Sequence, residues 1–353
     1  MTQTQLRLPA EWEPQAAVLI AWPHAGTDWA DRLAEVETTY VALAAAIARF
    51  EPVVICVADA AVRERAAGLL AEAGVDAARV RWVEIPYDDT WLRDSGPITL
   101  TDGRRFVLDD FRFTGWGGKF EAGRDDRLVE GLIARGLFGD AEHQRIDWAL
   151  EGGAIESDGA GTVLTTWNCL EHRHGSGRRD AIAATLCETL GAGRVLGLDH
   201  GYLEGDDTDA HIDTLARLAP DDAIVYQACD DAEDSHYAPL ARMADELVAL
   251  RTADGRPYRL HALPWARPIL DAGPDGERRL AASYANYLIV NGAVLVPAYG
   301  DPADAADAAA AAIIGAAHPG RTIVPIPCRP LIWQNGSLHC VTMQLPAGVL
   351  AQR

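Results

Sequence analysis

Short apolar runs alternate with helical periods through the first quarter of the chain. The runs Ala16–Trp22, Val53–Val57 and Val80–Ile85 have the length and composition of buried strands. Between them, Asp31–Phe50 and Ala60–Ala73 carry apolar residues at helical spacing. Regular alternation of strands with helices is typical of α/β proteins, and the sequence therefore predicts that fold class.

The alternation continues to the end of the chain, and two hairpins stand out within it. Leu150–Thr166 contains two strand-like runs around an Asp-Gly turn, and Ser283–Tyr299 places Asn291-Gly292 between two apolar runs. Further strands are predicted at residues 98–100, 223–227 and 322–327. Further helices are predicted at residues 124–136, 178–190, 236–250 and 302–317.

The stretch Gly205–Leu218, GDDTDAHIDTLARL, joins an acidic approach to an apolar and β-branched end. If this stretch is a strand, His211 and Asp213 share one face, because alternate residues of a strand point the same way. An imidazole beside a carboxylate, preceded by three more aspartates, favours a cation-binding site with a proton-transfer group. The alternative is an acidic surface loop followed by a half-buried strand.

A polar residue opens a β-rich run five times along the chain, at intervals of roughly 55–75 residues. No low-complexity linker or shift in composition marks a domain boundary between these runs. Five units ringed about an axis would bring their opening residues together at the centre. The alternative is that any α/β chain shows strands and helices at such intervals. The five opening residues are Asp94, Glu151, His211, Asn286 and Cys340.

The composition and net charge limit which classes of binding partner are expected. The chain has 353 residues, 49% of them hydrophobic, and a formal net charge of -21. Nucleic acid and anionic membranes would be repelled, so neither is expected as a partner, whereas a small cationic substrate is compatible. The N-terminus has no apolar leader, and six scattered cysteines form no C-x-x-C pair. We therefore expect reduced thiols and a cytoplasmic location.

The candidate side chains suit a guanidinium, a planar cation that carboxylates bind through paired hydrogen bonds. Asp94 and Asp213 have no obvious neutralising partner apart from the neighbouring Arg93. Cys340, expected in a strand after a glycine-containing loop, could attack the central carbon while His211 transfers protons. The alternatives are a buried apolar thiol and a satisfied structural histidine. No spacing matches a zinc or di-iron pattern, so no metal or organic cofactor is predicted.

Seven motifs follow one another along nearly the whole chain: EWEPQAAVLIAWPH, DDTWLRDSGP, GWGGK, EGGAIESDGAGT, GDDTDAHIDTLAR, AASYANYLIVNGAVLVPAYGDP and GSLHCVTMQ. In this order they resemble the agmatine deiminases (agmatine iminohydrolases), a bacterial peptidylarginine-deiminase-like family of the guanidino-group modifying (pentein) superfamily. The resemblance implies a five-bladed α/β propeller of ββαβ units, with residues 1–353 as a single catalytic domain. It also implies a cysteine hydrolase that converts agmatine to N-carbamoylputrescine and ammonia; a homo-oligomer is left open.

Matching motif positions carries the family's roles over to eight residues of this chain. By resemblance, Cys340 is the nucleophile, His211 the general acid and base, and Glu151 the carboxylate that pairs with His211. Asp94 and Asp213 are the clamp for the guanidinium. The residues matched to the substrate channel are Trp91, Asp207 and Trp116.

The chain also departs from the family pattern. Glu156 stands where many members have histidine, TTWNCLEHRHGSGR replaces a TTE-x-CLLN-x-NRNP run, and Gln334–Ser337 replaces a loop that often has three glycines. These departures spare the catalytic positions but bear on the fit around the distal amine of the substrate. Two alternatives stay open: the same chemistry on free or peptidyl arginine, and a catalytically silent cation-binding module. The acid-rich motifs favour agmatine, because the α-carboxylate of arginine would need a basic partner.

Overall fold

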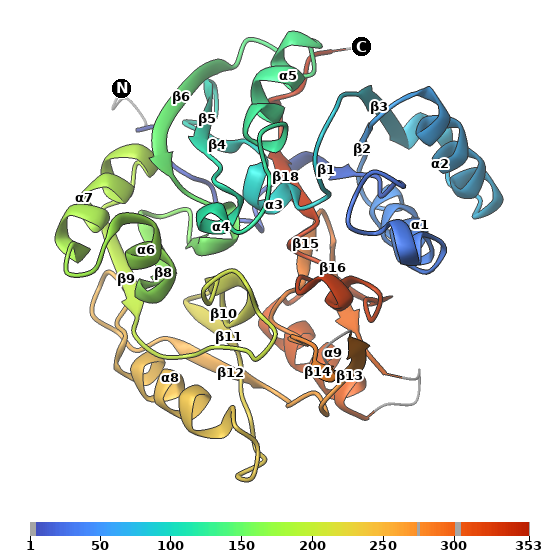
Figure 1. The fold of residues 1–353 in the computed structure, drawn as a ribbon. Coiled ribbons are helices and arrows are strands. Elements are labelled where there is room, and N and C mark those ends of the chain that lie inside the picture. The colour runs from blue at the N-terminus through green and yellow to red at the C-terminus, as the bar shows by residue number, and fades with distance from the viewer. Residues whose placement is uncertain (1–4, 274–275, 301–304, 353) are drawn as a thin grey trace.

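The structure is a computed structural model that describes residues 5–273, 276–300 and 305–352. The strands among these residues form five mixed sheets of three or four strands and one two-stranded hairpin. The sheets are arranged around a common centre, with the longer helices toward the rim (Figure 1). The predicted α/β fold class is therefore confirmed.

The two ends of the chain meet in one sheet, whose strand order is β18-β1-β2-β3. Strand β1 runs antiparallel to β18 and parallel to β2, which in turn runs parallel to β3. Helix α2 begins where the Asp59 side chain accepts hydrogen bonds from the N–H groups of Ala61 and Val62. The elements of this unit are β1 (Gln15–Ala21), α1 (Leu33–Ala48), β2 (Val53–Val57), α2 (Ala60–Glu72), β3 (Val80–Glu84) and β18 (Thr342–Pro346).

The other four sheets repeat one pattern, in which the first strand is antiparallel to the second and the second is parallel to the third. At least one helix connects the second strand to the third. The elements are β4 (Ile98–Thr101), β5 (Phe106–Arg112), α4 (Gly115–Gly118), α5 (Leu128–Ala134), β6 (Glu142–Ala149), β7 (Ile155–Ser157), β8 (Thr162–Thr166), α6 (Trp167–His174), α7 (Arg179–Leu190), β9 (Arg194–Leu198), β10 (Ala216–Ala219), β11 (Ala223–Gln227), α8 (Tyr237–Ala249), β12 (Arg259–Leu263), β15 (Leu288–Val290), β16 (Ala293–Ala298), α9 (Ala305–Ala317) and β17 (Thr322–Pro327). Outside this pattern lie α3 (Leu92–Ser95), β13 (Leu270–Gly273) and β14 (Gly276–Arg279).

The apolar runs form strands because both faces of the first sheet are covered. Val18 and Ile20 of β1 pack into one hydrophobic cluster with β2 and α1, whereas the alternate residue Leu19 packs into a second cluster. All five residues of β2 are buried. A strand buried on both faces needs a continuous apolar sequence, which is the signal that the sequence provides here.

Most predicted elements are confirmed. The predicted strands 53–57, 223–227 and 322–327 have the observed bounds of β2, β11 and β17, and both predicted hairpins form. The predicted helix 302–317 is observed as α9 from Ala305 onward, and residues 302–304 lie outside the described residues. No helix among the described residues is both long and apolar enough to cross a membrane.

The prediction that His211 and Asp213 lie on a strand is wrong. Strand β10 begins only at Ala216, and residues 212–214 form a short 3-10 turn. Side chains satisfy the backbone in this turn: Thr208 Oγ1 accepts from the His211 N–H at 3.1 Å, and Thr214 Oγ1 donates to the His211 carbonyl at 2.9 Å. Cys340 likewise lies in a turn before β18 rather than within a strand.

A buried guanidinium joins the sheet of β10, β11 and β12 to neighbouring parts of the interior. Arg217 of β10 has no exposed surface, and its Nη2 lies 2.6 Å from Glu11 Oε2. Its Nε pairs with Glu156, and Nη1 donates to the carbonyl of Tyr287 at 2.7 Å. Two carboxylates in the interior thus share one cation.

Replacing Arg217 by Met should destabilise the protein by about 3–5 kcal/mol, because two carboxylates then stay in the interior without their cation. Urea unfolding followed by circular dichroism measures this change. The matched control is Arg256→Met, which removes a solvent-exposed ion pair with Asp222 and should leave the unfolding midpoint unchanged. Equal midpoints for the two variants would contradict this account.

Candidate active site

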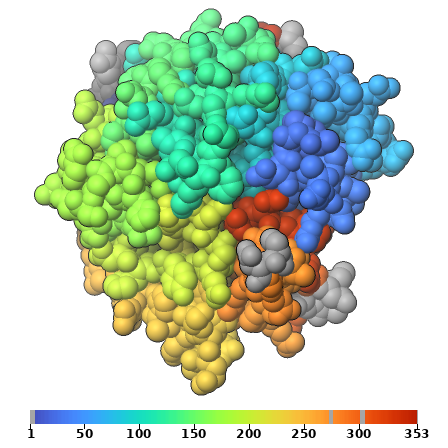
Figure 2. Space-filling model, in the orientation of Figure 1, coloured from blue at the N-terminus to red at the C-terminus, as the bar shows by residue number. Residues whose placement is uncertain are grey.

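The five opening residues lie a few positions before the first strand of each sheet, and they meet at the centre of the molecule. His211 Nδ1 lies 3.7 Å from Asp94 Oδ1, and His211 Nε2 lies 3.7 Å from Glu151 Oε2. Asn286 Nδ2 lies 3.3 Å from Cys340 Sγ. All five side chains are buried. Figure 2 shows that segments from every part of the chain contribute to the face over this centre.

Cys340 stands at the floor of a cavity, with carboxylate and amide oxygens beside its sulfur. Its Sγ lies 3.6 Å from Asp213 Oδ2 and 3.4 Å from Asn286 Oδ1. Burial raises the pKa of the Cys340 thiol well above its ordinary value, and the charges of Asp213 and Asp94 raise it further. The thiol is therefore neutral in the free protein, and a bound cation would favour the thiolate.

At His211, burial and the neighbouring groups shift the pKa in opposite directions. Burial lowers the pKa of its imidazole, but Asp94, Cys169 and Glu151 outweigh burial, so the pKa lies well above the ordinary value. Neither ring nitrogen has a hydrogen-bond partner at ordinary distance within the described part of the chain. The neighbouring groups thus favour the protonated form of His211, which can serve as a proton donor.

Asp94 is held by neutral donors. Its Oδ1 accepts from the Gly153 N–H at 2.9 Å, and its Oδ2 accepts from Trp116 Nε1 at 2.9 Å. Burial raises the pKa of Asp94 to about 6, against the lowering effect of His211. Gly153 is what permits this convergence, since a Cβ there would lie 2.6 Å from His211 Nδ1 and 2.8 Å from Asp94 Oδ1.

Asp213 is held by a charged network instead. Burial raises the pKa of Asp213, but the hydrogen bond from His339 Nδ1 at 2.8 Å and the nearby positive charges bring it below the ordinary value. Its Oδ2 makes this contact. Its Oδ1 has no hydrogen-bond partner among the described residues although it is fully buried. An ionised oxygen without a donor can accept one from a ligand.

The cavity above Cys340 has a volume of about 450 Å³ and is strongly acidic. Among the described residues that line it, seven are acidic and Lys119 is basic. Such a surface concentrates small cations. The acidic residues are Asp28, Asp88, Asp89, Asp94, Glu121, Asp125 and Asp207.

The three residues predicted for the substrate channel all line this cavity. Trp91 packs so closely on Gly336 that a Cβ there would lie 2.2 Å from the Trp91 ring. Asp207 Oδ2 accepts from Asn335 Nδ2 at 2.9 Å. The backbone of Trp116 is left-handed, with φ at 56°, and this turn directs the indole N–H at Asp94.

The structure therefore brings together all eight predicted site residues. The structure also shows where the residues that depart from the family pattern lie. Glu156 pairs with Arg217 in the interior, away from the cavity, whereas Asn335 and Gly336 of the loop before Cys340 are part of its wall. The loop before Cys340, and not Glu156, therefore affects which substrates fit in the cavity.

Several supporting residues escaped the sequence analysis. Arg173 of α6 donates from Nε to Glu151 Oε1 at 2.8 Å and from Nη1 to Asp209 Oδ2 at 2.7 Å. His339 supports Asp213, and Cys169 lies 3.9 Å from Glu151. No spacing in the sequence signals these partners. Arg173 and Cys169 reach Glu151 only through the fold of their own unit, whereas His339 and Asp213 come from different units. Asn286 was recognised as an opening residue but not as a neighbour of the thiol.

Comparison with known proteins agrees with this arrangement. Residues 7–346 match the model of the Porphyromonas-type peptidyl-arginine deiminase family. The agmatine deiminase of Stutzerimonas stutzeri is 35% identical to the chain over 365 residues, covering 96% of this chain and 95% of that protein.

Two solved structures superpose over nearly the full length. A Porphyromonas gingivalis protein with the provisional name arginine deiminase is 46% identical, with a TM-score of 0.89 and coverage of 98% of this chain and 100% of that one. An agmatine deiminase of C. jejuni with substrate bound is 30% identical, with a TM-score of 0.87 and coverage of 98% and 97%. Since the family model and these relatives span almost every residue, this chain belongs to the Porphyromonas-type peptidyl-arginine deiminase family.

Proposed function

We propose that this chain is an agmatine deiminase, a cysteine hydrolase that converts agmatine and water to N-carbamoylputrescine and ammonia. The observation that carries the proposal is the meeting of the Cys340 thiol, the His211 imidazole and the carboxylates of Asp94 and Asp213 next to an acidic cavity, which Cys340 and Asp94 line. A guanidinium fits this set because it is planar, permanently charged and rich in donors. The reaction needs no metal or organic cofactor.

The two carboxylates hold the guanidinium. Asp213 offers Oδ1, which has no donor among the described residues, and Asp94 lies near it, since a Cβ on Gly153 would meet Asp94 Oδ1 at 2.8 Å and Asp213 Oδ2 at 3.2 Å. Paired charge-assisted hydrogen bonds then fix the central carbon above Cys340 Sγ. The bound positive charge lowers the pKa of the thiol and favours the nucleophilic thiolate.

The thiolate attacks the guanidinium carbon and forms a tetrahedral adduct. His211 gives its proton to one nitrogen, the C–N bond breaks, and ammonia leaves a covalent thiouronium on Cys340. Water replaces the ammonia, loses a proton to His211, and adds to the same carbon. The C–S bond then breaks to give the carbamoyl product and free Cys340. Glu151, 3.7 Å from His211 Nε2, holds the imidazolium in place.

The acidic wall of the cavity favours agmatine over arginine. Agmatine ends in a second cation, which Asp207 and the other carboxylates would attract, whereas arginine would bring a carboxylate against them. Relatives named agmatine deiminase support this choice. The name of the Porphyromonas gingivalis structure keeps arginine as the rival substrate.

The fold supports one catalytic domain over residues 1–353 in the form of a five-bladed α/β propeller of the pentein type. Each of the five larger sheets supplies one of the central residues, and at least one helix joins successive parallel strands in each. A site built from every unit cannot be divided between independent domains.

Cys340→Ala should abolish ammonia release, because it removes the sulfur that forms the covalent intermediate. The assay offers agmatine, arginine and a blocked arginyl peptide in parallel, and wild-type enzyme should act on agmatine best. Cys187→Ala, on α7 and outside the cavity, is the matched control and should keep full activity. Turnover by the Cys340 variant would contradict the mechanism, and preference for arginine would contradict the substrate.

Asp94→Asn and Asp213→Asn should each lower kcat at least about tenfold, because the lost carboxylate also positions the carbon for attack. The free energy of substrate binding should become less favourable by roughly 1.5–3 kcal/mol, the contribution of one charge-assisted hydrogen bond. Steady-state kinetics on agmatine, with circular dichroism to check folding, measures both. The control is Asp28→Asn, an exposed carboxylate at the cavity, which should keep kcat. Wild-type kcat in the folded Asp94 and Asp213 variants would rule out the clamp.

The profile of kcat/KM against pH should be bell-shaped. Its acid limb should lie near pH 6, since the pKa of Asp94 in the free enzyme is raised to about 6 and the protonated acid no longer holds the cation. Its basic limb should reflect loss of the His211 proton, well above pH 6.5. Bound guanidinium favours ionised Asp94, so the acid limb of kcat should lie at lower pH. A kcat/KM that stays constant through pH 6 would contradict this assignment.

A further inference from the structure

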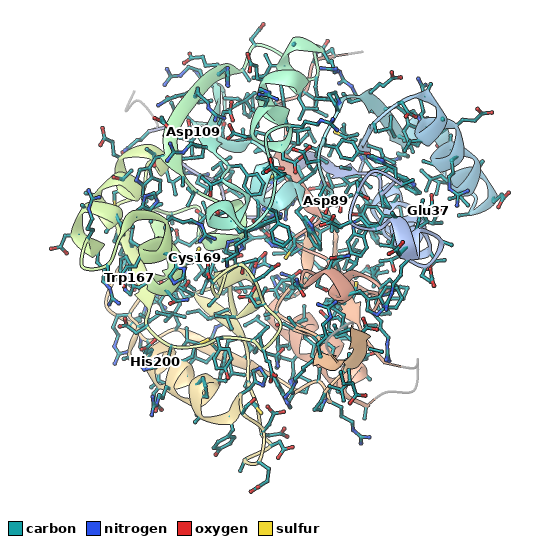
Figure 3. The ribbon with its side chains drawn as sticks, in the orientation of Figure 1. Glu37, Asp89, Asp109, Trp167, Cys169 and His200 are labelled. Atoms are coloured by element: carbon teal, nitrogen blue, oxygen red, sulfur yellow. The ribbon has the colours of Figure 1, made fainter. Side chains whose placement is uncertain are left out.

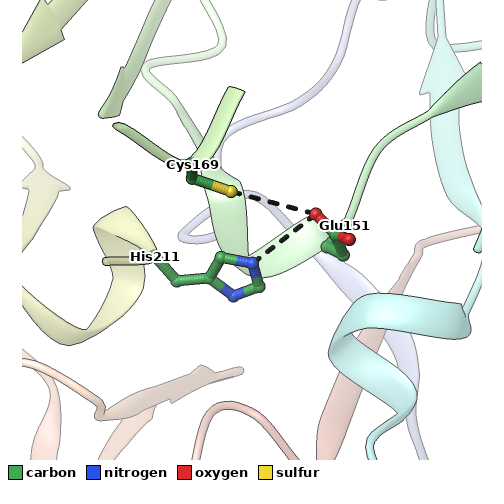
Figure 4. Close-up of side chains that lie close together, drawn as sticks. All are labelled: Glu151, Cys169 and His211. Carbon is green, nitrogen blue, oxygen red and sulfur yellow. Dashed lines mark hydrogen bonds and ion pairs between the residues drawn. The ribbon is translucent and has the colours of Figure 1, made fainter. Parts of the chain in front are cut away.

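Behind the imidazole of His211 lies a second thiol for which the proposed mechanism has no use. Cys169 Sγ lies 3.9 Å from Glu151 Oε2, and His211 Nε2 lies 3.7 Å from the same oxygen (Figure 4). The ligand atoms of these three residues all lie within 4.8 Å of one another. All three side chains are buried, and Cys169 projects from α6 toward the centre of the molecule (Figure 3).

These separations are close to those of a tetrahedral zinc site. With Zn–S near 2.3 Å and Zn–N and Zn–O near 2.0–2.2 Å, neighbouring ligand atoms stand roughly 3.3–3.7 Å apart. The observed 3.7 Å and 3.9 Å exceed this by a few tenths of an ångström, and the third pair, between Cys169 and His211, lies within 4.8 Å. Side-chain rotations would then bring the three ligands to bonding distance.

The ligand atoms are also available. His211 Nε2 has no hydrogen-bond partner at ordinary distance among the described residues. Arg173 occupies Oε1 of Glu151, which leaves Oε2 facing Cys169 and His211. Arg173 is also paired with Asp209, 2.7 Å away, an aspartate that it shares with Lys119.

In a second cluster of metal-ligating side chains, the ligand atoms are already engaged by other residues. Glu11, Glu156 and His339 also approach one another in the interior. Arg217 already pairs with both carboxylates, and His339 already bonds Asp213 through Nδ1. A cation there would have to displace a buried guanidinium, so this cluster is a closed structural network.

We infer that Glu151, Cys169 and His211 form an inhibitory site for a thiophilic divalent cation, with Zn²⁺ as the physiological type. One sulfur, one imidazole nitrogen and one carboxylate oxygen select Zn²⁺, Cd²⁺ or Co²⁺, whereas Mg²⁺ and Ca²⁺ prefer oxygen ligands alone. The acidic cavity, whose lining includes Asp94 beside His211, concentrates cations next to the site. Three protein ligands leave the fourth position to water, so binding is reversible.

Binding displaces two protons, one from the Cys169 thiol and one from Nε2 of the protonated His211, and the metal bonds to the sulfur and the nitrogen in their place. The inhibition rests on the proposed function, because it follows from the loss of His211 as proton donor. The binding itself does not rest on that function, and the two are therefore tested separately.

The binding test uses Cd²⁺ and the Cys340→Ala protein, which removes the other thiol near His211. Cd²⁺ should bind with one-to-one stoichiometry and give the ultraviolet charge-transfer absorption of a cadmium thiolate. The absorption should vanish when Cys169→Ser is added and persist when Cys187→Ser is added instead. An unchanged absorption in the Cys169 double variant would overturn the site, whether or not the protein proves to be a deiminase.

The activity test uses Zn²⁺ with the Cys169→Ser and Cys187→Ser single variants. Wild type and the Cys187 variant should be inhibited alike and recover with EDTA, whereas Mg²⁺ should have no effect. Loss of a direct ligand should raise the inhibitory Zn²⁺ concentration at least about tenfold in the Cys169 variant, since even losing an outer-shell partner costs 10–100-fold in affinity. Equal inhibition of all three proteins would place the cation at Cys340 and overturn the proposal.

Discussion

The structure depends on how its buried negative charge is compensated. Carboxylates from several units point into one interior, and an ionised carboxylate in a low-dielectric environment is stable only with a partner. Arg217 compensates Glu11 and Glu156, and Arg173 compensates Glu151. These pairs surround the centre, so the packing of the sheets and the electrostatics of the site are fixed by the same contacts.

Compensation is incomplete at the centre. Asp94 receives hydrogen bonds only from neutral donors, and burial raises its pKa to about 6, while Asp213 keeps one oxygen without a donor in the described structure. The cavity in front of them adds further carboxylates. The carboxylates at the centre thus lack a full set of partners in the free protein, and a cation of the substrate supplies what is missing. Affinity for a cationic substrate follows from the way the fold is held together.

Much of this could be predicted from the sequence. Apolar runs such as Val53–Val57 report burial on both faces directly, and the Asn291-Gly292 turn specifies its hairpin. The opening residues could be found because each stands at the same point of a repeated unit. What could not be predicted depends on weak local patterns and on contacts between residues far apart in the sequence. The edge strand β6 is largely exposed and has no apolar run, and the local bonds of Thr208 and Thr214 replace the expected strand around His211. Arg173 and Cys169 meet Glu151 only when their own unit has folded, and His339 meets Asp213 only when two units have assembled.

The pairing of β18 with β1 has a consequence for biosynthesis. The strand that completes the first sheet, and Cys340 just before it, leave the ribosome after the strands and helices of the other four units. The other units can form their own sheets during translation, but the ring of sheets stays open and lacks its thiol until β18 emerges. A nascent or C-terminally truncated chain therefore holds the whole carboxylate cluster without a nucleophile. Translation itself thereby delays the appearance of a reactive cysteine until the surrounding protein exists to bury it.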